Sequence, residues 1–166
     1  DSSGAVLKPL DENAVAEVVR ELVATGVASI AVSFIHAYRN PAHERVARSV
    51  IERVAPQVYV SISSDVLPEF REFERTSTTV LNAYVGPKMR GYLSRLCSRI
   101  ADVGITAEPL TFHSNGGLLP VKTVEQLPVL TCLSGPAAGV VGSCAIGAEA
   151  GISEIITFDV GGTSTD

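Results

Sequence analysis

Asp159-Val160-Gly161-Gly162-Thr163-Ser164-Thr165-Asp166 is the stretch of this 166-residue chain that carries the strongest structural signal. It overlaps the end of the apolar run from Ile155 to Val160, which predicts a buried strand that delivers Asp159 to its carboxyl end. Two glycines follow, where the backbone can turn and approach a ligand closely. The consecutive amides of such a turn form a concave site for anions, and the hydroxyl residues behind them add donors. The stretch therefore predicts a phosphate-binding loop.

Asp159 has a different predicted role, because a carboxylate cannot attract phosphate. We expect it to hold Mg²⁺ directly or through water, since magnesium prefers oxygen ligands and keeps part of its hydration shell. The residues expected to cradle phosphate are Gly161, Gly162, Thr163, Ser164 and Thr165. A tight hairpin with a polar tip is the structural alternative. The stretch is not a Walker loop, because no Gly-Lys-Ser/Thr follows the glycines.

Two loops upstream are further candidates for ligand contact. Ser134-Gly135-Pro136 predicts a helix start whose amides point outward, where Ser134 and Gly135 can contact phosphate or ribose. The helix behind it is rich in glycine, which costs about 1 kcal/mol per residue relative to alanine, so we expect close approach of another backbone. The run Pro109 to His113 predicts a strand that ends in a loop containing Asn115 and Gly116. This loop either contacts nucleotide or substrate, or is a simple turn.

The N-terminal half predicts a strand–helix–strand unit. Asp11 is a good cap for a first helix, and the apolar run Val27 to Ile35 predicts a strand buried on both faces. Asn40-Pro41 then predicts a second helix start, and Val58 to Ile62 alternates as a strand does. This order is that of a βαβ unit with parallel strands.

A long helical signal runs from Leu81 to Val103. Gly86-Pro87 lies inside it and is expected to kink or split the helix, because proline lacks the amide donor and clashes with the preceding turn. The charged cluster from Arg71 to Arg75 precedes this helix. It is either a substrate clamp or, more simply, a set of charges that are solvated or paired within the fold.

Composition narrows the class of protein. Hydrophobic residues make up 46% and charged residues 19%, which is typical of a globular chain, and the net charge of −5 without a basic patch argues against nucleic acid as a partner. No apolar run is long enough for a membrane helix, and the spacing of the three histidines does not predict a metal site. The three cysteines predict small buried side chains in a reducing compartment, namely Cys97, Cys132 and Cys144. The start at Asp1, without Met, predicts a piece of a longer protein.

The residues quoted above resemble one known family. Asp159 to Asp166 looks like the phosphate hairpin of the actin/Hsp70/sugar-kinase ATPase superfamily, and in the hydantoinase/oxoprolinase family it typically reads Asp-Met-Gly-Gly-Thr-Ser-Thr-Asp, with Val160 replacing the Met here. His113 stands where an apolar residue is common. Further strings resemble the same family in collinear order over nearly the whole chain, and these are Asn40-Pro41-Ala42-His43-Glu44, Arg71 to Tyr84, Ser114-Asn115-Gly116-Gly117 and Ser134 to Gly139.

The resemblance implies an α/β fold of two ribonuclease-H-like lobes, as in actin-like ATPases, with nucleotide between them. Residues 1–70 would hold the end of the first lobe as a βαβ unit, and residues 71–104 the connecting region with its long kinked helix. Residues 105–166 would begin the second lobe and stop within the phosphate-binding hairpin. We therefore expect both lobes to be incomplete, with the first lobe's own phosphate hairpin absent.

The resemblance also implies a function for the parent protein. Members use ATP and Mg²⁺ to activate a carbonyl oxygen by phosphorylation before ring opening of hydantoins or 5-oxoproline, whereas relatives carboxylate acetone or acetophenone. We expect a cytoplasmic enzyme that acts on a small cyclic amide and pairs with a second, hydantoinase B-type subunit or domain in a homo- or hetero-oligomer. A non-catalytic ATPase switch, as in Hsp70-like chaperones, is the alternative of another class. The catalytic residues and the substrate stay unassigned.

Overall fold

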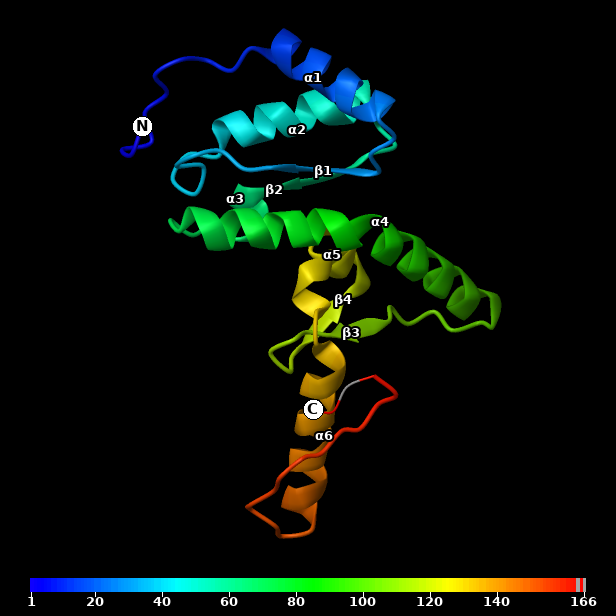
Figure 1. Cartoon of the computed structure of the whole chain (residues 1–166). Helices are drawn as coiled ribbons and strands as arrows, with labels where there is room; N and C mark the ends of the chain where they lie inside the picture. Colours follow the sequence, from blue (N-terminus) through cyan, green and yellow to red (C-terminus); the bar gives the residue numbers. More distant parts are fainter. Residues whose placement is uncertain (164, 166) are drawn as a thin grey trace. The chain divides into compact units, whose positions relative to one another are not determined.

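The computed structural model describes every residue of the chain except Ser164 and Asp166. The chain forms two compact units, Asp1–Tyr92 and Leu93–Asp166, and each combines helices with a small sheet (Figure 1). This mixed α/β architecture confirms the predicted fold class. Among the described residues, no helix combines the length and the apolar character that crossing a bilayer requires.

The N-terminal unit is built around a parallel pair of strands. Its elements in chain order are α1 (Glu12–Ala24), β1 (Ser29–Val32), α2 (Ala42–Val54), β2 (Tyr59–Ile62), α3 (Ser63–Val66) and the first part of α4 (Glu72–Asp102). The strands β1 and β2 are hydrogen-bonded in parallel, from Ser29 opposite Tyr59 to Val32 opposite Ile62. Because α2 connects them, the predicted βαβ unit is confirmed.

Local sequence signals place these elements. The Asp11 carboxylate accepts hydrogen bonds from the backbone amides of Asn13 and Ala14 at the start of α1, which satisfies amides that have no partner within the helix. β1 is shorter than the predicted run Val27 to Ile35, because its hydrogen-bonded pairing with β2 ends at Val32. The amide of Phe34 donates to the Glu44 carboxylate at 2.8 Å instead of to a neighbouring strand.

An apolar core lies between the helices α1 and α2 and one face of the strands. Figure 1 shows α1 and α2 on one side of β1 and β2, and the first part of α4 on the other. Burying each large aliphatic side chain stabilises the unit by roughly 1.5–3 kcal/mol. The buried members of this core are Val19, Val32, Ala47, Ile51, Ala55, Val58 and Ile62.

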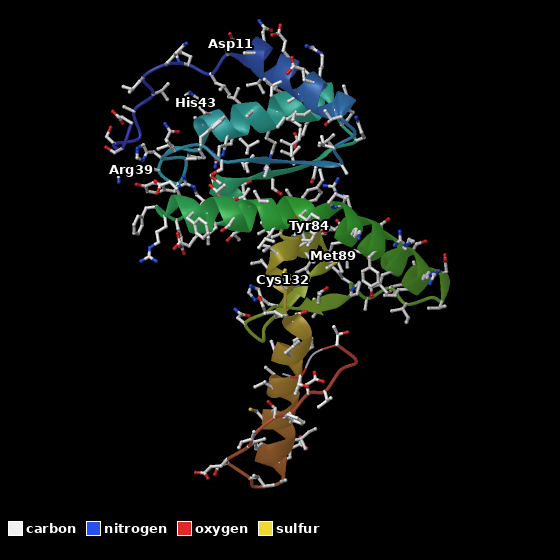
Figure 2. All side chains as sticks on the ribbon, viewed as in Figure 1. Asp11, Arg39, His43, Tyr84, Met89 and Cys132 are labelled. Carbon is white, nitrogen blue, oxygen red and sulfur yellow. The ribbon has the colours of Figure 1, made fainter. Side chains whose placement is uncertain are left out.

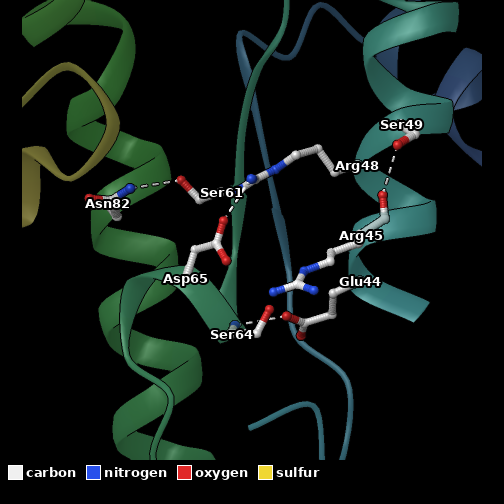
Figure 3. A network of polar contacts seen from close by, with 8 residues as sticks. All are labelled: Glu44, Arg45, Arg48, Ser49, Ser61, Ser64, Asp65 and Asn82. Atoms are coloured by element: carbon white, nitrogen blue, oxygen red, sulfur yellow. Dashed lines mark hydrogen bonds and ion pairs between the residues drawn. The ribbon is translucent and has the colours of Figure 1, made fainter. Parts of the chain in front are cut away.

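The opposite face of the sheet meets α4 through polar side chains. The hydroxyls of Ser33 and Thr76 are 2.8 Å apart. The Asn82 amide donates to the Ser61 hydroxyl at 2.9 Å, and both side chains are buried, as Figure 3 shows. Paired hydroxyls and amides of this kind fix a single alignment of helix and strand, since any slip would leave buried polar groups without partners.

Helix α4 is continuous through Gly86-Pro87, so of the two predicted outcomes the split does not occur. Gly86 has a packing reason. A Cβ built there would overlap the ring of Tyr59, which is 3% exposed, and the Arg90 guanidinium lies 4.6 Å from the centre of that ring. Burial raises the pKa of the Tyr59 hydroxyl above its usual value, and the Arg90 charge offsets part of that rise.

The C-terminal unit consists of a hairpin followed by helices. Its elements after the end of α4 are β3 (Leu110–Phe112), β4 (Leu118–Pro120), α5 (Val121–Gln126), the short 3₁₀ helix η1 (Pro128–Thr131) and α6 (Ser134–Glu149). β3 and β4 pair antiparallel, and the loop predicted after the first of them is the turn that joins them.

The predicted strand Ile155 to Val160 is wrong. The segment is irregular, and its only ladder contact in the described part of the chain is an isolated bridge between Val160 and Thr165. A strand requires a neighbour with which to exchange hydrogen bonds. The side chains expected to be buried are instead exposed, with Ile156 at 96% and Phe158 at 78%.

The cysteines also differ from prediction. All three are free thiols, but Cys132 and Cys144 are exposed and Cys97 is only half-buried; Cys132 is labelled in Figure 2. Their burial was predicted from the usual preference of cysteine for interiors. Cys144 lies on α6, a helix whose described residues are mostly exposed or half-buried, and a helix without a covering layer cannot bury its side chains.

Candidate phosphate-binding site

A groove in the C-terminal unit joins Asp159 to the first half of α6. The groove has a volume of about 260 Å³. Asp159 is exposed and supplies the one carboxylate among the described residues that line it. The lining residues are Pro136, Gly139, Val140 and Ser143 from α6, together with Thr157, Phe158 and Asp159. The structure therefore brings the predicted metal ligand next to the predicted phosphate-binding helix.

The glycine-rich loop turns back directly after Asp159. Val160 and Thr165 form an antiparallel bridge that closes the turn. A Cβ built on Gly162 would meet no atom of the described residues within 4 Å, so these residues leave the backbone open here. Ser164, also predicted to contact phosphate, lies outside the described residues. The exposed residues of the turn are Gly161, Gly162, Thr163 and Thr165.

The N-cap residue of α6 provides no side-chain cap for the first amides of the helix. This residue is Leu133, and it has the left-handed conformation, with φ 63°. Ser134 and Gly135 carry the first of these amides. Uncapped amides combine with the helix dipole to favour an anion. This geometry fits a phosphate, as predicted for Ser134 and Gly135.

The glycines of α6 differ in their surroundings. The expected close approach of backbone is seen at Gly147, where a Cβ would overlap the Ile155 side chain and lie 3.3 Å from the Ile152 carbonyl oxygen. It is not seen elsewhere along the helix. Within the described residues, a Cβ would meet nothing within 4 Å at Gly135, Gly139 and Gly142.

The loop with Asn115 and Gly116 lies against α6 but outside the lining of the groove. Asn115 Oδ1 accepts a hydrogen bond from the backbone N–H of Gly117 at 3.0 Å, and the backbone N–H of Asn115 donates to His113 Nδ1 at 2.9 Å. Gly116 has φ +88°, and a Cβ there would lie 2.9 Å from Val141. These contacts are those of a tight turn packed on a helix, which explains the glycine without a ligand.

Arg75 of the charged cluster is buried inside the N-terminal unit. It is 1% exposed, and its guanidinium donates to the carbonyl oxygens of Glu69 at 2.8 Å and Phe34 at 2.9 Å. The same group lies 5.6 Å from the centre of the Tyr38 ring. The geometry favours pairing within the fold over a substrate clamp at this position.

Sequence reasoning assigned no role to Glu44, which is 0% exposed. Its carboxylate accepts hydrogen bonds from the Phe34 amide, the Ser63 hydroxyl and the Ser64 amide, at 2.7–2.8 Å; Figure 3 shows the contact with Ser64. It joins the carboxyl ends of β1 and β2. A charged residue on the apolar side of a predicted helix was the signal that could have revealed it.

Side chains that bind metals do not gather elsewhere in the described part of the chain. No three His, Cys, Asp or Glu side chains there lie close enough together to hold an ion. A magnesium ion that arrives with nucleotide needs few protein ligands, because it binds through one or two carboxylates and substrate phosphates. One exposed Asp159 beside α6 fits that mode.

Comparisons with known proteins relate nearly the whole chain to one family. The model of the hydantoinase/oxoprolinase family matches residues 75–166, and that of the hydantoinase/oxoprolinase N-terminal region matches residues 1–55. The caprolactamase subunit alpha of Pseudomonas jessenii is 36% identical over 165 residues, which are 99% of this chain and 24% of the relative. The crystal structure of that ATP-dependent caprolactamase superposes with a TM-score of 0.85.

Two further relatives carry different activities in their names. The 5-oxoprolinase of Saccharomyces cerevisiae is 33% identical over 162 residues, which are 97% of this chain and 12% of the relative. The nucleotide-free structure of an acetone carboxylase, described as ATP-dependent, superposes with a TM-score of 0.86 at 31% identity, over 99% of this chain and 24% of that one. The chain thus spans about a quarter of the caprolactamase and carboxylase chains, and less of the 5-oxoprolinase.

Proposed function

The chain belongs to the hydantoinase/oxoprolinase family, and from that premise we propose that it is part of an ATP-dependent enzyme that opens small cyclic amides. The observation that carries the proposal is the groove in which Asp159 lies with Pro136 and Gly139 from the first half of α6. The relatives named for caprolactam and 5-oxoproline support an amide as the substrate class.

Asp159 and the predicted phosphate-binding residues have proposed roles. Asp159 holds Mg²⁺, directly or through water. The amides and hydroxyls of the loop after it, together with the amides of Ser134 and Gly135, bind phosphate oxygens. Bound ATP would supply the phosphoryl group that activates a carbonyl oxygen. A direct contact of Asn115 and Gly116 with nucleotide is not part of the proposal, because their loop lies outside the lining of the groove.

A second candidate function is ATP-dependent carboxylation of a ketone. The likeness to acetone carboxylase favours it, because that structure superposes as closely as the caprolactamase. Both reactions use ATP to activate oxygen atoms, so the same groove serves either. A non-catalytic ATPase switch has less support, since the relatives compared above are named as enzymes. A substrate panel of hydantoin, 5-oxoproline, caprolactam and acetone with bicarbonate separates the reactions by ATP-dependent product formation.

The proposed partner subunit is supported by the same comparison, and the proposed cytoplasmic location is supported by the cysteines. The caprolactamase relative is called a subunit, which supports a second, hydantoinase B-type subunit or domain in a homo- or hetero-oligomer. The free thiols at Cys97, Cys132 and Cys144 fit a reducing compartment such as the cytoplasm.

Asp159→Asn in the intact protein tests the proposal. Asparagine keeps the shape and can still hydrogen-bond, but it removes the charge that faces magnesium. We expect ATP-dependent turnover to fall at least about a hundredfold, equivalent to roughly 2.7 kcal/mol, with partial recovery in excess Mg²⁺. Glu154→Gln is the matched control, because Glu154 is exposed on the same segment and does not line the groove. Near-wild-type turnover of Asp159→Asn at limiting magnesium would contradict the assignment.

A further inference from the structure

A separate cavity lies within the N-terminal unit, where the chain leaves the carboxyl end of β1. It has a volume of about 210 Å³. The carboxyl ends of parallel strands are where α/β proteins bind ligands, because the connections there leave a crevice. The loop after β1 supplies Ile35, His36 and Asn40 to this cavity, and His43 reaches it from the first turn of α2.

His36 combines a turn position with an unpaired ring nitrogen. Its φ of +61° is that of the third residue in a turn that the Ala37 amide closes by donating to the Phe34 carbonyl oxygen at 3.2 Å. Its Nδ1 atom is buried and has no hydrogen-bond partner within the described residues. A buried polar atom without a partner calls for a reason, and a binding role is one of the recognised ones.

The charged groups around the cavity favour an anion. Lys8 lines it together with His36 and His43. The one carboxylate among the described lining residues belongs to Asp1, and it already accepts hydrogen bonds from the Ser3 amide and hydroxyl and from the Ala5 amide. Within the described lining, the Lys8 ammonium therefore has no free carboxylate beside it, and an ammonium binds oxyanions through charge-assisted hydrogen bonds. An imidazole N–H adds a further donor.

Apolar side chains complete the wall. Val6, Leu7 and Ile35 line the cavity and are largely exposed, at 49%, 81% and 74%. The segment that carries the first two is held in place, because the Asn40 side-chain amide donates to the Gly4 carbonyl oxygen at 2.8 Å. Exposed aliphatic groups beside cationic ones suit a ligand with a charged end and a small hydrocarbon body.

We propose that this cavity binds a small organic carboxylate, with the carboxylate against Lys8, His36 and His43 and the hydrocarbon body against the aliphatic wall. The site is distinct from the groove at Asp159, since all its residues lie in the other unit. The inference does not depend on the proposed ATP chemistry, because binding is expected in the absence of nucleotide.

The test uses the intact protein without ATP and two probes that differ in one group. Binding of 5-oxoproline and of 2-pyrrolidinone, the same ring without a carboxylate, is measured by saturation-transfer NMR titration. We expect 5-oxoproline to bind at least about tenfold more tightly, the contribution of a charge-assisted contact. Equal binding of the two probes, or binding of neither to folded protein, would overturn the proposal.

Variants then locate the site. His36→Asn removes the imidazole and keeps a residue that tolerates positive φ, and Lys8→Gln changes an exposed side chain that carries no risk to folding. Each is expected to weaken 5-oxoproline binding about tenfold. Arg45→Gln removes an exposed cation two residues from His43 that does not line the cavity, and it should bind as the wild type does. Unchanged binding in both His36→Asn and Lys8→Gln would overturn the assignment, whatever Asp159→Asn does to ATP turnover.

Discussion

Glu44 shows at the level of one residue how the ends of β1 and β2 are held. Its buried carboxylate accepts from two backbone amides and one hydroxyl. In Glu44→Gln the new amide group must face one of those donors, whichever way it turns, so a buried N–H loses its partner. We expect a loss of about 2–4 kcal/mol in the free energy of unfolding, measured by urea unfolding followed by circular dichroism.

Glu52→Gln is the control for that change, because Glu52 lies exposed on the same helix. It should alter stability by no more than about 0.5 kcal/mol. If the two variants unfold at the same urea concentration, the carboxylate does not hold the strand ends together.

Arg75 is the second residue whose role is decided by its surroundings. Arg75→Ala leaves the carbonyl oxygens of Phe34 and Glu69 without their donor, and we expect destabilisation of about 2–4 kcal/mol. Arg75→Lys should lose less, since an ammonium group still serves one carbonyl. A structural role would be contradicted if Arg75→Ala kept the urea midpoint of the wild type while its turnover fell more than about a hundredfold.

At the level of elements, the close packing of α4 on the strands requires a residue without a side chain at Gly86. Gly86→Ala improves helix propensity by about 1 kcal/mol, yet its Cβ would overlap the buried Tyr59 ring. We expect a net loss of about 1–3 kcal/mol from overpacking, measured by urea unfolding. A gain in stability would show that the ring moves aside freely.

A double-mutant cycle checks the cause. Tyr59→Ala removes the ring and leaves a cavity, but it also removes the overlap. The variant that combines both changes should therefore be more stable than the sum of the single losses predicts, by about 0.5–3 kcal/mol. Additive losses would place the effect of Gly86→Ala elsewhere in the helix.

For the whole molecule, the groups proposed to bind phosphate come, among the described residues, only from the start of α6 and the loop after Asp159. Phosphoryl transfer requires donors and metal that converge from both sides of the nucleotide. We therefore expect the 166-residue chain to hydrolyse no ATP above the blank in a phosphate-release assay. A clear turnover that Asp159→Asn abolishes would contradict the two-lobe interpretation.

Much of the fold is predictable from short stretches. The cap at Asp11, the start of α2 and the βαβ order depend on interactions between residues close in sequence, and the structure has them where the patterns predict. Helix α4 begins nine residues before the predicted run, at Glu72, since acidic residues in a first turn are stabilised by the helix dipole. The apolar pattern alone does not mark such a start.

Only part of the candidate site could be predicted from short stretches of sequence. The glycine-rich stretch after Asp159 could be singled out, because backbone freedom and consecutive amides are properties of adjacent residues. Its placement beside α6 depends on packing between distant segments. The strand predicted at Ile155 was wrong for the same reason, since strand structure needs a partner that no local pattern supplies.

Local chemistry was thus sufficient for the family and the fold class, because each follows from the order of neighbouring residues. The phosphate-binding role of the loop after Asp159 stays a prediction. The fold was needed to show that Glu44 and Arg75 are buried, that Cys132 and Cys144 are exposed, and that His36 lies at a cavity. Burial and hydrogen-bond partners are set by residues far away in the sequence, and only folding brings those residues into contact.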